Sequence, residues 1–578
     1  MIDISKPINI VVEGRGKIRL TPTEHVTTGG EGHVFHTDSL AVKLWADPDR
    51  AASDHMIDRL PALLKLKHPS IVAPTALVKD LKDQVIGYAM PWVSGWALPL
   101  AFTNDWRRQH QFADDDAAKF VAIMREVLLY THSLNVLMGD PNELNILGLK
   151  DRPSYIDVDS WLPPGFSSTQ DKVLPTIRDY HHRAFTREAD RFGFAVVSFA
   201  LFTGIHPYLG VHPAFKRTNN QDKDLMLRMQ ANASVFDKDV KLNAAVRAFS
   251  CIPAALLTWY EAVFKHGNRD APPDLTGVPI PKAAMHTKMV IAAGGSLTVT
   301  KVFTLQAKFV REVSTNIIQC DNGDLVSLAR PFGNTFGHAA MDVNVVNQFS
   351  DGLFLAAVVD GHLTGGALTF SQTVRMVSCG IDVSRLWVAA NRIFSITPPG
   401  LDEMSVFTLK DGKTLLFNKR WSINSNSTIF GDGAAVYTAI SASFLVVPQI
   451  SGSVALLRVP ELDGMKPLAI FGRERIALLV MATPQGHYKR VLVHLESTLD
   501  RYAIAITDTD HANLNVAVTA TGIVLRITSE DRLEITVPVK SLTPLAPIDL
   551  KNANDGRLIA GSEGVFWISG ETIYKVSM

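Results

Sequence analysis

Tight-turn dipeptides divide the second half of the sequence, residues 289–578, into short apolar runs. Runs such as residues 386–388 and 444–447 are too short for helices and have the composition of strands. Asn-Gly and Asp-Gly favour two-residue hairpin turns, because such turns require positive φ at their central positions. These dipeptides are Asn322-Gly323, Asp351-Gly352, Asp360-Gly361, Asp411-Gly412, Asp432-Gly433, Asp463-Gly464 and Asp555-Gly556. Because no convincing helical pattern accompanies them, we expect an all-β domain.

The size of this second half narrows the choice of all-β fold. It is too long for one small sandwich, and it would supply six or seven four-stranded blades of about 40–45 residues each. We therefore predict a β-propeller over residues 289–578. The dipeptides are irregularly spaced and no Gly-His…Trp-Asp signature repeats, so the sequence leaves the number of blades open.

Residues 1–275 instead mix strands and helices. Alternating residues 8–12 and 17–20 flank a glycine-containing turn and predict a hairpin. From Asp114 onward, apolar residues recur at helical spacing behind an acidic first turn, which suits the helix dipole. Further helices are predicted over residues 190–203 and within residues 221–264. Together these patterns indicate an α+β domain.

Prolines separate the two halves. After Ala271-Pro272-Pro273 comes Val278-Pro279-Ile280-Pro281, and we interpret residues 276–288 as a linker. A chain of 578 residues is also too long for one ordinary domain. We therefore expect a multidomain protein with one α+β domain and one propeller.

Composition narrows the functional classes. Lys+Arg and Asp+Glu both number 57, so no basic footprint indicates a nucleic acid or a membrane surface as partner. Three cysteines without a CxxC pair exclude a disulfide scaffold and suit a reducing cytoplasm. The longest apolar run, residues 192–203, is too short to span a bilayer. With no signal-peptide pattern at the N-terminus, we expect a cytoplasmic protein.

Two motifs in the first half suit phosphate binding. Residues 29–35, GGEGHVF, form a glycine-rich turn whose backbone amides can approach phosphate oxygens, and Val34 can cover an adenine ring. Lys43, in the strand-like run AVKL, can hold α- and β-phosphates. Taken alone, a glycine-rich stretch of this kind is more often a plain Gly-Gly turn, and a lysine in a run such as AVKL is more often a surface side chain.

Two further motifs carry carboxylates. In residues 138–147, MGDPNELNIL, Asp140 can approach a hydroxyl and Asn145 can direct an amide oxygen toward a metal. In residues 155–161, YIDVDSW, Asp157 and Asp159 follow a strand and are natural Mg²⁺ ligands. The alternative for both is ordinary turn chemistry.

Taken in order, these motifs resemble the protein-kinase superfamily. Residues 30–34 look like the Gly-rich loop, Lys43 like the strand lysine, and Asp140 with Asn145 like the catalytic loop. Asp157 looks like the metal-binding Asp of the DFG motif. The likeness covers residues 27–273 and extends to the segments THSLNV (131–136), HPSIV (68–72), MPWVSG (90–95), DRF (190–192) and FTGIHPY (202–208). The motifs are most similar to a divergent bacterial or phage-borne branch of Ser/Thr-type kinases.

This resemblance implies a bilobal fold, with an N-lobe over residues 1–92 and a C-lobe over residues 93–275. It implies a Ser/Thr-type protein kinase that uses ATP and Mg²⁺, with Asp140 receiving the proton of the acceptor hydroxyl. Metal ligands would be Asn145 and Asp157, with Asp159 as a possible auxiliary. The nucleotide would be bound by Gly29, Gly30, Gly32, Val34, Lys43, Met90, Pro91 and Val93. The propeller, with its loops on a rigid disc, would recruit substrate or partner proteins.

Several positions depart from the family pattern. Met138-Gly139 replaces the usual His-Arg, and Asn142 stands where a catalytic-loop lysine is usual. Asp159 occupies the glycine position of DFG, where it would either add a metal ligand or cap the next loop. The αC glutamate position falls on Arg59, so the acidic partner expected for Lys43 is Asp54 or Asp58. These departures keep open a nucleotide-binding pseudokinase scaffold, and a small-molecule phosphotransferase is a further alternative.

Overall fold

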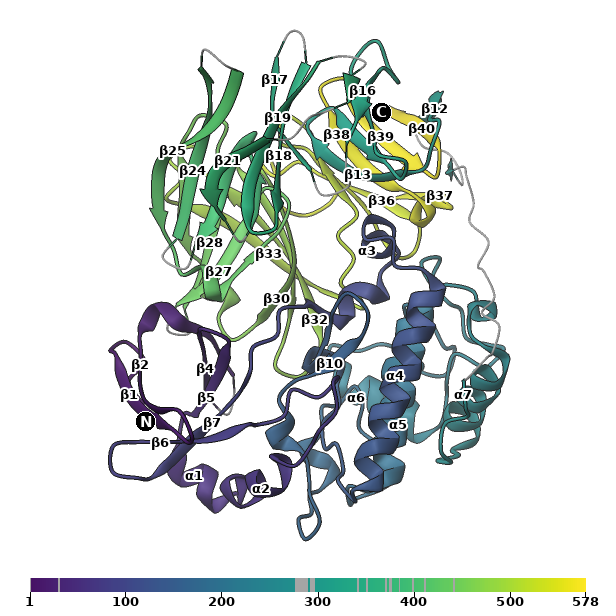
Figure 1. The fold of residues 1–578 in the computed structure, drawn as a ribbon. Helices are drawn as coiled ribbons and strands as arrows, with labels where there is room; N and C mark the ends of the chain where they lie inside the picture. Colours follow the sequence, from purple (N-terminus) through teal and green to yellow (C-terminus); the bar gives the residue numbers. More distant parts are fainter. Residues whose placement is uncertain are drawn as a thin grey trace.

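The protein is multidomain and mostly sheet, with few helices (Figure 1). The computed structural model describes residues 2–29, 32–275, 289–291, 297–339, 343–349, 352–369, 372–373, 377–383, 385–397, 400–409, 412–439 and 442–577. The predicted linker, residues 276–288, lies outside the described residues. None of the helices in the described ranges is long and apolar enough to cross a membrane.

A curled seven-stranded sheet begins the chain. The predicted hairpin is confirmed, with Ile8 opposite Leu20 and Val12 opposite Gly16. Helices α1 (Pro48–Ser53) and α2 (Met56–Leu63) adjoin the sheet, and Met56 and Leu60 pack in the same buried cluster as Trp45 and Tyr88. In spatial order the strands are β2 (Gly16–Leu20), β1 (Ile8–Val12), β6 (Ala76–Lys79), β7 (Val85–Pro91), β5 (Leu40–Trp45), β4 (Gly32–Thr37) and β3 (His25–Thr28).

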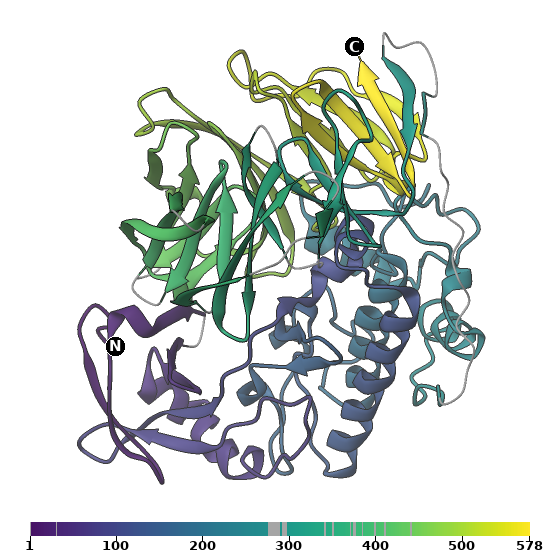
Figure 2. The same ribbon diagram turned by 45° about the horizontal axis from the view of Figure 1, so that its top comes forward.

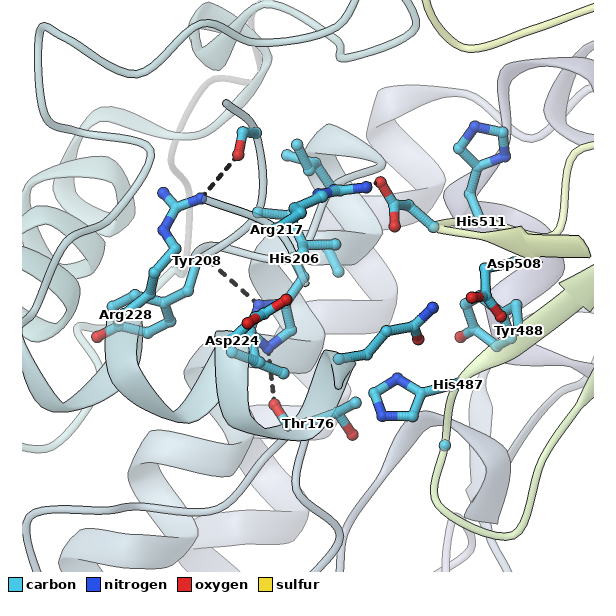
Figure 3. A pocket seen from close by; sticks show the side chains of 18 of the residues that line it. Thr176, His206, Tyr208, Arg217, Asp224, Arg228, His487, Tyr488, Asp508 and His511 are labelled. Carbon is cyan, nitrogen blue, oxygen red and sulfur yellow. Dashed lines mark hydrogen bonds and ion pairs between the residues drawn. The ribbon is translucent and has the colours of Figure 1, made fainter. Parts of the chain in front are cut away.

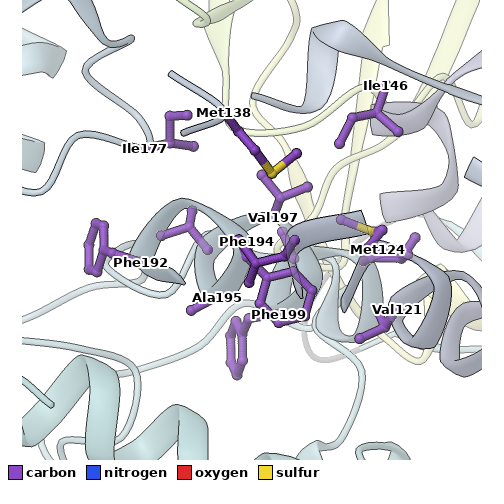
Figure 4. Packing of buried hydrophobic residues seen from close by; sticks show 14 of the residues in the cluster. Val121, Met124, Met138, Ile146, Ile177, Phe192, Phe194, Ala195, Val197 and Phe199 are labelled. Atoms are coloured by element: carbon purple, nitrogen blue, oxygen red, sulfur yellow. The ribbon is translucent and has the colours of Figure 1, made fainter. Parts of the chain in front are cut away.

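Helices dominate the rest of the first half. The predicted helix at Asp114 is confirmed as α4 (Asp114–Ser133), and α5 (Arg187–Thr203) begins three residues before its predicted start. The side chains of α5 are almost all buried, and they pack with α4 around Met138 (Figure 4). The other elements are α3 (Asn104–Gln109), α6 (Gln221–Gln230), α7 (Ala254–His266) and a small sheet of β8 (Trp96–Ala97), β9 (Ile146–Gly148) and β10 (Pro153–Tyr155).

The segment between α6 and α7 differs from expectation. The helical pattern was predicted within residues 221–264, yet residues 231–253 contain only the 3₁₀ turn η6 (Phe249–Cys251). The guanidinium of Arg228, in α6, donates to the carbonyl oxygen of Ala233 in this segment and to that of Gly210, in the loop before α6. These contacts outweigh local helix propensity.

The described residues after residue 289 form seven sheets, five of them four-stranded. No α-helix occurs in this described part, as predicted. The first sheet contains β12 (Thr298–Thr304) with β38 (Arg557–Gly561), β39 (Gly564–Ser569) and β40 (Thr572–Ser577). The second contains β13 (Phe309–Ser314), β14 (Ile317–Cys320), β15 (Asp324–Ser327), β16 (Thr335–His338) and β20 (Gln372–Thr373). The third contains β17 (Asn344–Phe349), β18 (Gly352–Val359), β19 (His362–Thr369) and β21 (Val377–Asp382), and the fourth contains β22 (Leu386–Ala389), β23 (Arg392–Thr397), β24 (Gly400–Leu409) and β25 (Gly412–Ser422).

The remaining three sheets follow along the chain. Their strands are β26 (Thr428–Phe430), β27 (Ala435–Ala439), β28 (Ala442–Pro448) and β29 (Val454–Arg458); β30 (Lys466–Arg473), β31 (Ile476–Ala482), β32 (Tyr488–Leu495) and β33 (Tyr502–Thr509); and β34 (Val516–Val518), β35 (Val524–Ile527), β36 (Arg532–Thr536) and β37 (Ile548–Lys551) with β11 (Val290–Ile291).

Each sheet packs against the next through a shared buried apolar cluster. The sheet of β34–β37 packs in this way against β38–β40, and β38–β40 pack against β13–β16. Strand β12 pairs with β40, with Thr300 opposite Lys575, so residues near both ends of this half share one sheet.

The turn dipeptides have mixed outcomes. Asp360-Gly361 forms the predicted tight turn, with φ of 50° and 80° between β18 and β19. Asn322-Gly323 likewise connects β14 to β15. Asp463-Gly464 and Asp555-Gly556 instead lie between sheets, so these two predictions of hairpins are wrong. Asp351 and Asp411 lie outside the described residues.

The second half lies over both parts of the first half (Figures 1 and 2). Near β3, the side-chain amide of Asn424 donates to the carbonyl oxygen of His25 at 2.8 Å. At the opposite side, α3 meets β38, where the buried Arg557 and Asp105 form an ion pair at 3.2 Å. The contacts fix the second half to the curled sheet and to the helical part.

Candidate functional site

Lys43 lies at the centre of the candidate site, on β5 of the curled sheet. Its side chain is buried, and its ammonium binds the carboxylates of Asp157 and Asp159. Both oxygens of Asp159 lie 2.9 Å from Nζ, and the carboxylate is fully buried. Burial opposes ionisation of Asp157, but Lys43 outweighs it and lowers the pKa of this carboxyl below its usual value. The three charged groups thus form one cluster, in which Lys43 and Asp159 are buried and Asp157 is partly exposed.

The acidic partners of Lys43 therefore differ from the expected ones. Asp54 and Asp58 are both exposed, and Asp58 binds the His55 ring at 2.8 Å. Arg59 donates to the backbone carbonyl of Ser160 at 3.4 Å. Asp159 is fully buried, and its carboxylate binds the ammonium of Lys43.

Asp140 lies on the loop between α4 and β9. Its carboxylate accepts hydrogen bonds from the side-chain amide of Asn142 at 2.9 Å and from the backbone N–H of Leu174 at 3.4 Å. Burial raises the pKa of Asp140 to about 7, and these two donors only partly oppose the rise. A carboxyl with this pKa is suited to accept a proton near neutral pH.

The buried Asp190 of α5 holds the loop that contains Asp140. Its carboxylate accepts the backbone N–H of Met138 at 2.9 Å and binds the His132 ring at 2.9 Å. Gly139 has φ of 73°, and a Cβ there would lie 2.8 Å from the carbonyl oxygen of Ser160. Glycine at this position thus lets the loop lie against the segment that contains Asp157 and Asp159.

Asn145 and Asp157 are brought together by backbone pairing. The N–H of Ile156 donates to the carbonyl oxygen of Asn145 at 2.9 Å, and the Asn145 amide nitrogen donates to the carbonyl oxygen of Asp140 at 3.2 Å. That bond leaves the amide oxygen of Asn145 for another partner. An ionised carboxylate with an amide oxygen fits Mg²⁺, which also takes phosphate oxygens. No cluster of three or more His, Cys, Asp or Glu side chains suited to a metal occurs in the described ranges.

The residues expected to bind an adenine gather around one apolar cluster. Val34 and Val93 pack partly buried against a cluster that contains Met90, and Ile156, which was not predicted, packs there with them. Pro91, also predicted here, ends β7 and is exposed, opposite Leu40 of β5. This arrangement forms an apolar wall beside Lys43.

The glycine-rich turn is described only at its two ends. Gly29 donates its N–H to the carbonyl oxygen of Gly32 at 2.8 Å. A Cβ at Gly32 would lie 2.3 Å from the carbonyl oxygen of Leu44, so only glycine fits there. Gly30 and Glu31 lie outside the described residues.

The second half contacts the loop of Asp140 directly, which the sequence did not predict. The Tyr488 hydroxyl donates to the Glu143 carboxylate at 3.0 Å, and both side chains are buried. The Lys466 ammonium donates to the carbonyl oxygen of Leu144 at 2.8 Å. The Leu144 side chain packs against a buried cluster of β30–β32. No local signal in the sequence marks Lys466 or Tyr488, since each acts on a loop more than 300 residues away.

A cavity of about 740 Å³ lies next to this loop, between the two halves (Figure 3). Glu143 and Thr176 line it from the first half, together with α6 and the loop before it. His487, Tyr488 and the end of β33 line it from the second half. Across its rim, Arg217 and Asp510 form an ion pair at 2.6 Å.

No protein-family model matches this chain, and no curated protein matches it. The arrangement of Lys43, Asp140, Asn145 and Asp157 therefore rests on the residues and their geometry alone.

Proposed function

We propose that residues 1–275 form a bilobal protein-kinase-like domain that transfers the γ-phosphoryl group of ATP to a Ser or Thr hydroxyl of a protein. One observation carries this proposal: Lys43 on β5 binds Asp157 directly, while Asn145 ties Asp157 to the loop of Asp140. Lys43 of the curled sheet is thereby brought to the segment that contains Asp140, Asn145 and Asp157, about 100 residues further along the chain.

In the proposed reaction, Lys43 holds the α- and β-phosphates, and the apolar wall of Val34, Met90 and Val93 contacts the adenine. Asp140 orients the acceptor hydroxyl and takes its proton as the oxygen bonds to the γ-phosphorus. The bond between the γ-phosphorus and the β-phosphate oxygen breaks, and ADP leaves. Asn145 and Asp157, with Asp159 as an auxiliary ligand, would hold Mg²⁺, which supplies charge neutralisation at the phosphates.

We further propose that the seven sheets of residues 289–578 close into a seven-bladed β-propeller. The shared clusters between every pair of successive sheets and the pairing of β12 with β40 support this closure. The propeller would recruit the protein substrate or a partner. The cavity beside Glu143 supports this role, because both halves line it and Leu174, two residues before Thr176, donates to Asp140.

A second candidate is a nucleotide-binding pseudokinase scaffold with the propeller as its interaction module. The observation that favours it is the position of Asp159, which together with Asp157 binds the ammonium that would hold phosphates. In that case ATP binds without turnover.

Phosphate transfer from labelled Mg·ATP, with purified protein alone and with a cell lysate, distinguishes the two. We expect incorporation that falls by about 10²–10⁴-fold in Asp140→Asn. The matched control is Asp239→Asn, an exposed aspartate outside the site, which should incorporate as the wild type does. Stabilisation by Mg·ATP without incorporation supports the pseudokinase scaffold, whereas neither stabilisation nor incorporation contradicts both proposals.

A further inference from the structure

Lys466 is the first residue of β30 and reaches the catalytic loop from the second half. Its ammonium donates to the carbonyl oxygen of Leu144 at 2.8 Å, while the residue as a whole stays exposed. The neighbouring Leu144 side chain is packed against the apolar cluster of β30–β32. The backbone of both partners is thus fixed, and the ammonium is held at the edge of the site.

The ammonium of Lys466 is available to an anion. In the described part of the chain, no carboxylate lies within ion-pair distance of it. An ammonium has three N–H donors, of which the Leu144 carbonyl takes one. Leu144, whose carbonyl oxygen binds the ammonium, directly precedes Asn145, so Lys466 lies beside the proposed Mg²⁺ ligands. Desolvation of its ammonium lowers the pKa of Lys466, and the negative charge of Asp157 opposes that effect.

The catalytic loop offers no such cation of its own. Asn142 uses its amide nitrogen to hold Asp140 and its amide oxygen to accept the backbone N–H of Leu144. Lys43, the other ammonium, is bound by two carboxylates. Lys466 is therefore the ammonium beside this loop that is not paired with a carboxylate.

We propose that Lys466 binds a phosphate group of the nucleotide, so that the second half completes the nucleotide site of the first. This inference rests on the proposed function, because it assumes that a nucleoside triphosphate occupies the cleft of Lys43 and Asp157. It assigns the propeller a direct part in binding ATP, in addition to the recruitment of proteins.

The test measures the affinities of full-length wild type, Lys466→Met and Lys466→Arg for Mg·ATP and for adenosine by calorimetry. Loss of one charge-assisted hydrogen bond predicts that Lys466→Met weakens ATP binding by about tenfold. Adenosine, which has no phosphate, should bind all variants equally, and Lys466→Arg should retain most of the affinity for ATP. The control, Lys301→Met, changes an exposed lysine of β12 and should bind ATP as the wild type does.

The possible failures are distinguishable. If the wild type binds neither ATP nor adenosine, the proposed function fails. If the wild type binds ATP and Lys466→Met binds it equally or more tightly, the proposed function stands and the role of Lys466 is overturned. An equal loss of affinity for ATP and adenosine also overturns it, because that result indicates displacement of the loop instead of a lost phosphate contact.

Discussion

The phenol of Tyr488 donates a hydrogen bond to the carboxylate of Glu143 at 3.0 Å across 345 residues of sequence. Glu143 lies three residues after Asp140, and burial raises the pKa of its carboxyl. The second half of the chain therefore supports the loop that carries the proposed base. This support makes the loop sensitive to changes far from it in sequence.

Tyr488→Phe should lower both stability and phosphate transfer. The substitution leaves the buried Glu143 carboxylate without this donor, which costs about 1–3 kcal/mol of unfolding free energy. Urea unfolding and the transfer assay measure the two effects. Tyr502→Phe is the matched control, since Tyr502 donates to Glu461 at 2.8 Å in an exposed pair and should change stability by only about 0.5 kcal/mol. Equal effects of the two substitutions would contradict the role of Tyr488.

Lys43→Met should destabilise the protein as well as inactivate it. Removal of the ammonium leaves the carboxylate of Asp159 buried without its counter-charge, and such a loss costs about 3–5 kcal/mol. Lys43→Met combined with Asp159→Asn removes that charge and should recover part of the lost unfolding free energy, while transfer stays absent. A double variant that is less stable than Lys43→Met would contradict the predicted cost of leaving the Asp159 carboxylate buried without its counter-charge.

Glu312 of β13 should make stability depend on pH. Burial raises the pKa of Glu312 from 4.5 to about 7, against the opposing charges of Arg473 and Arg557, while Asp432 adds to the rise. Because the folded protein binds this proton more tightly than the unfolded chain, its contribution to stability is full below pH 4.5. That contribution is lost as the pH rises through about 7.

The unfolding free energy of Glu312→Gln relative to that of the wild type should therefore rise as the pH increases from 4.5 to 7. Above pH 7 the difference between the two proteins should stay constant. Urea unfolding at pH 5 and at pH 8 measures this change. A difference between variant and wild type that is the same at both values would show that Glu312 ionises normally in the folded protein.

Closure of the seven sheets can be tested by a disulfide between β12 and β40. Thr300 and Lys575 lie directly opposite each other, and opposite residues of antiparallel strands have a Cα separation that suits a disulfide. Thr300→Cys with Lys575→Cys should cross-link on mild oxidation and raise the melting temperature, as mass spectrometry and thermal unfolding would record. Thr300→Cys alone serves as the control. A pair that remains reduced would refute the register.

Local patterns in the sequence predicted local structure well. The first hairpin and α4 are where turn residues and apolar spacing placed them, because both depend on contacts between near neighbours. Residues 231–253 did not follow their helical pattern, since the buried Arg228 binds backbone carbonyls from outside any helix. Asp463-Gly464 and Asp555-Gly556 connect sheets, because the same dipeptide suits any tight reversal.

The sequence predicted which residues make up the candidate site better than it predicted their contacts. The structure brings Lys43, Asp140, Asn145 and Asp157 together, but it pairs Lys43 with Asp157 and Asp159, 114 and 116 residues away. Residue types alone did not indicate this pairing, because Asp54 and Asp58 are chemically equivalent and nearer in sequence. Lys466 and Tyr488 could not be predicted either, since their role depends on how two separately folded halves pack.

The pairing of β12 with β40 also sets the order in which a newly made chain can mature. During synthesis, residues 1–275 leave the ribosome first and can fold while Glu143 and Leu144 are still uncovered. Lys466 and Tyr488 emerge later, and the sheet that joins residues 298–304 to residues 572–577 is completed last. A chain interrupted within the second half thus has the loop of Asp140 without full support. If the proposed activity depends on that support, it is complete only after translation has passed β40.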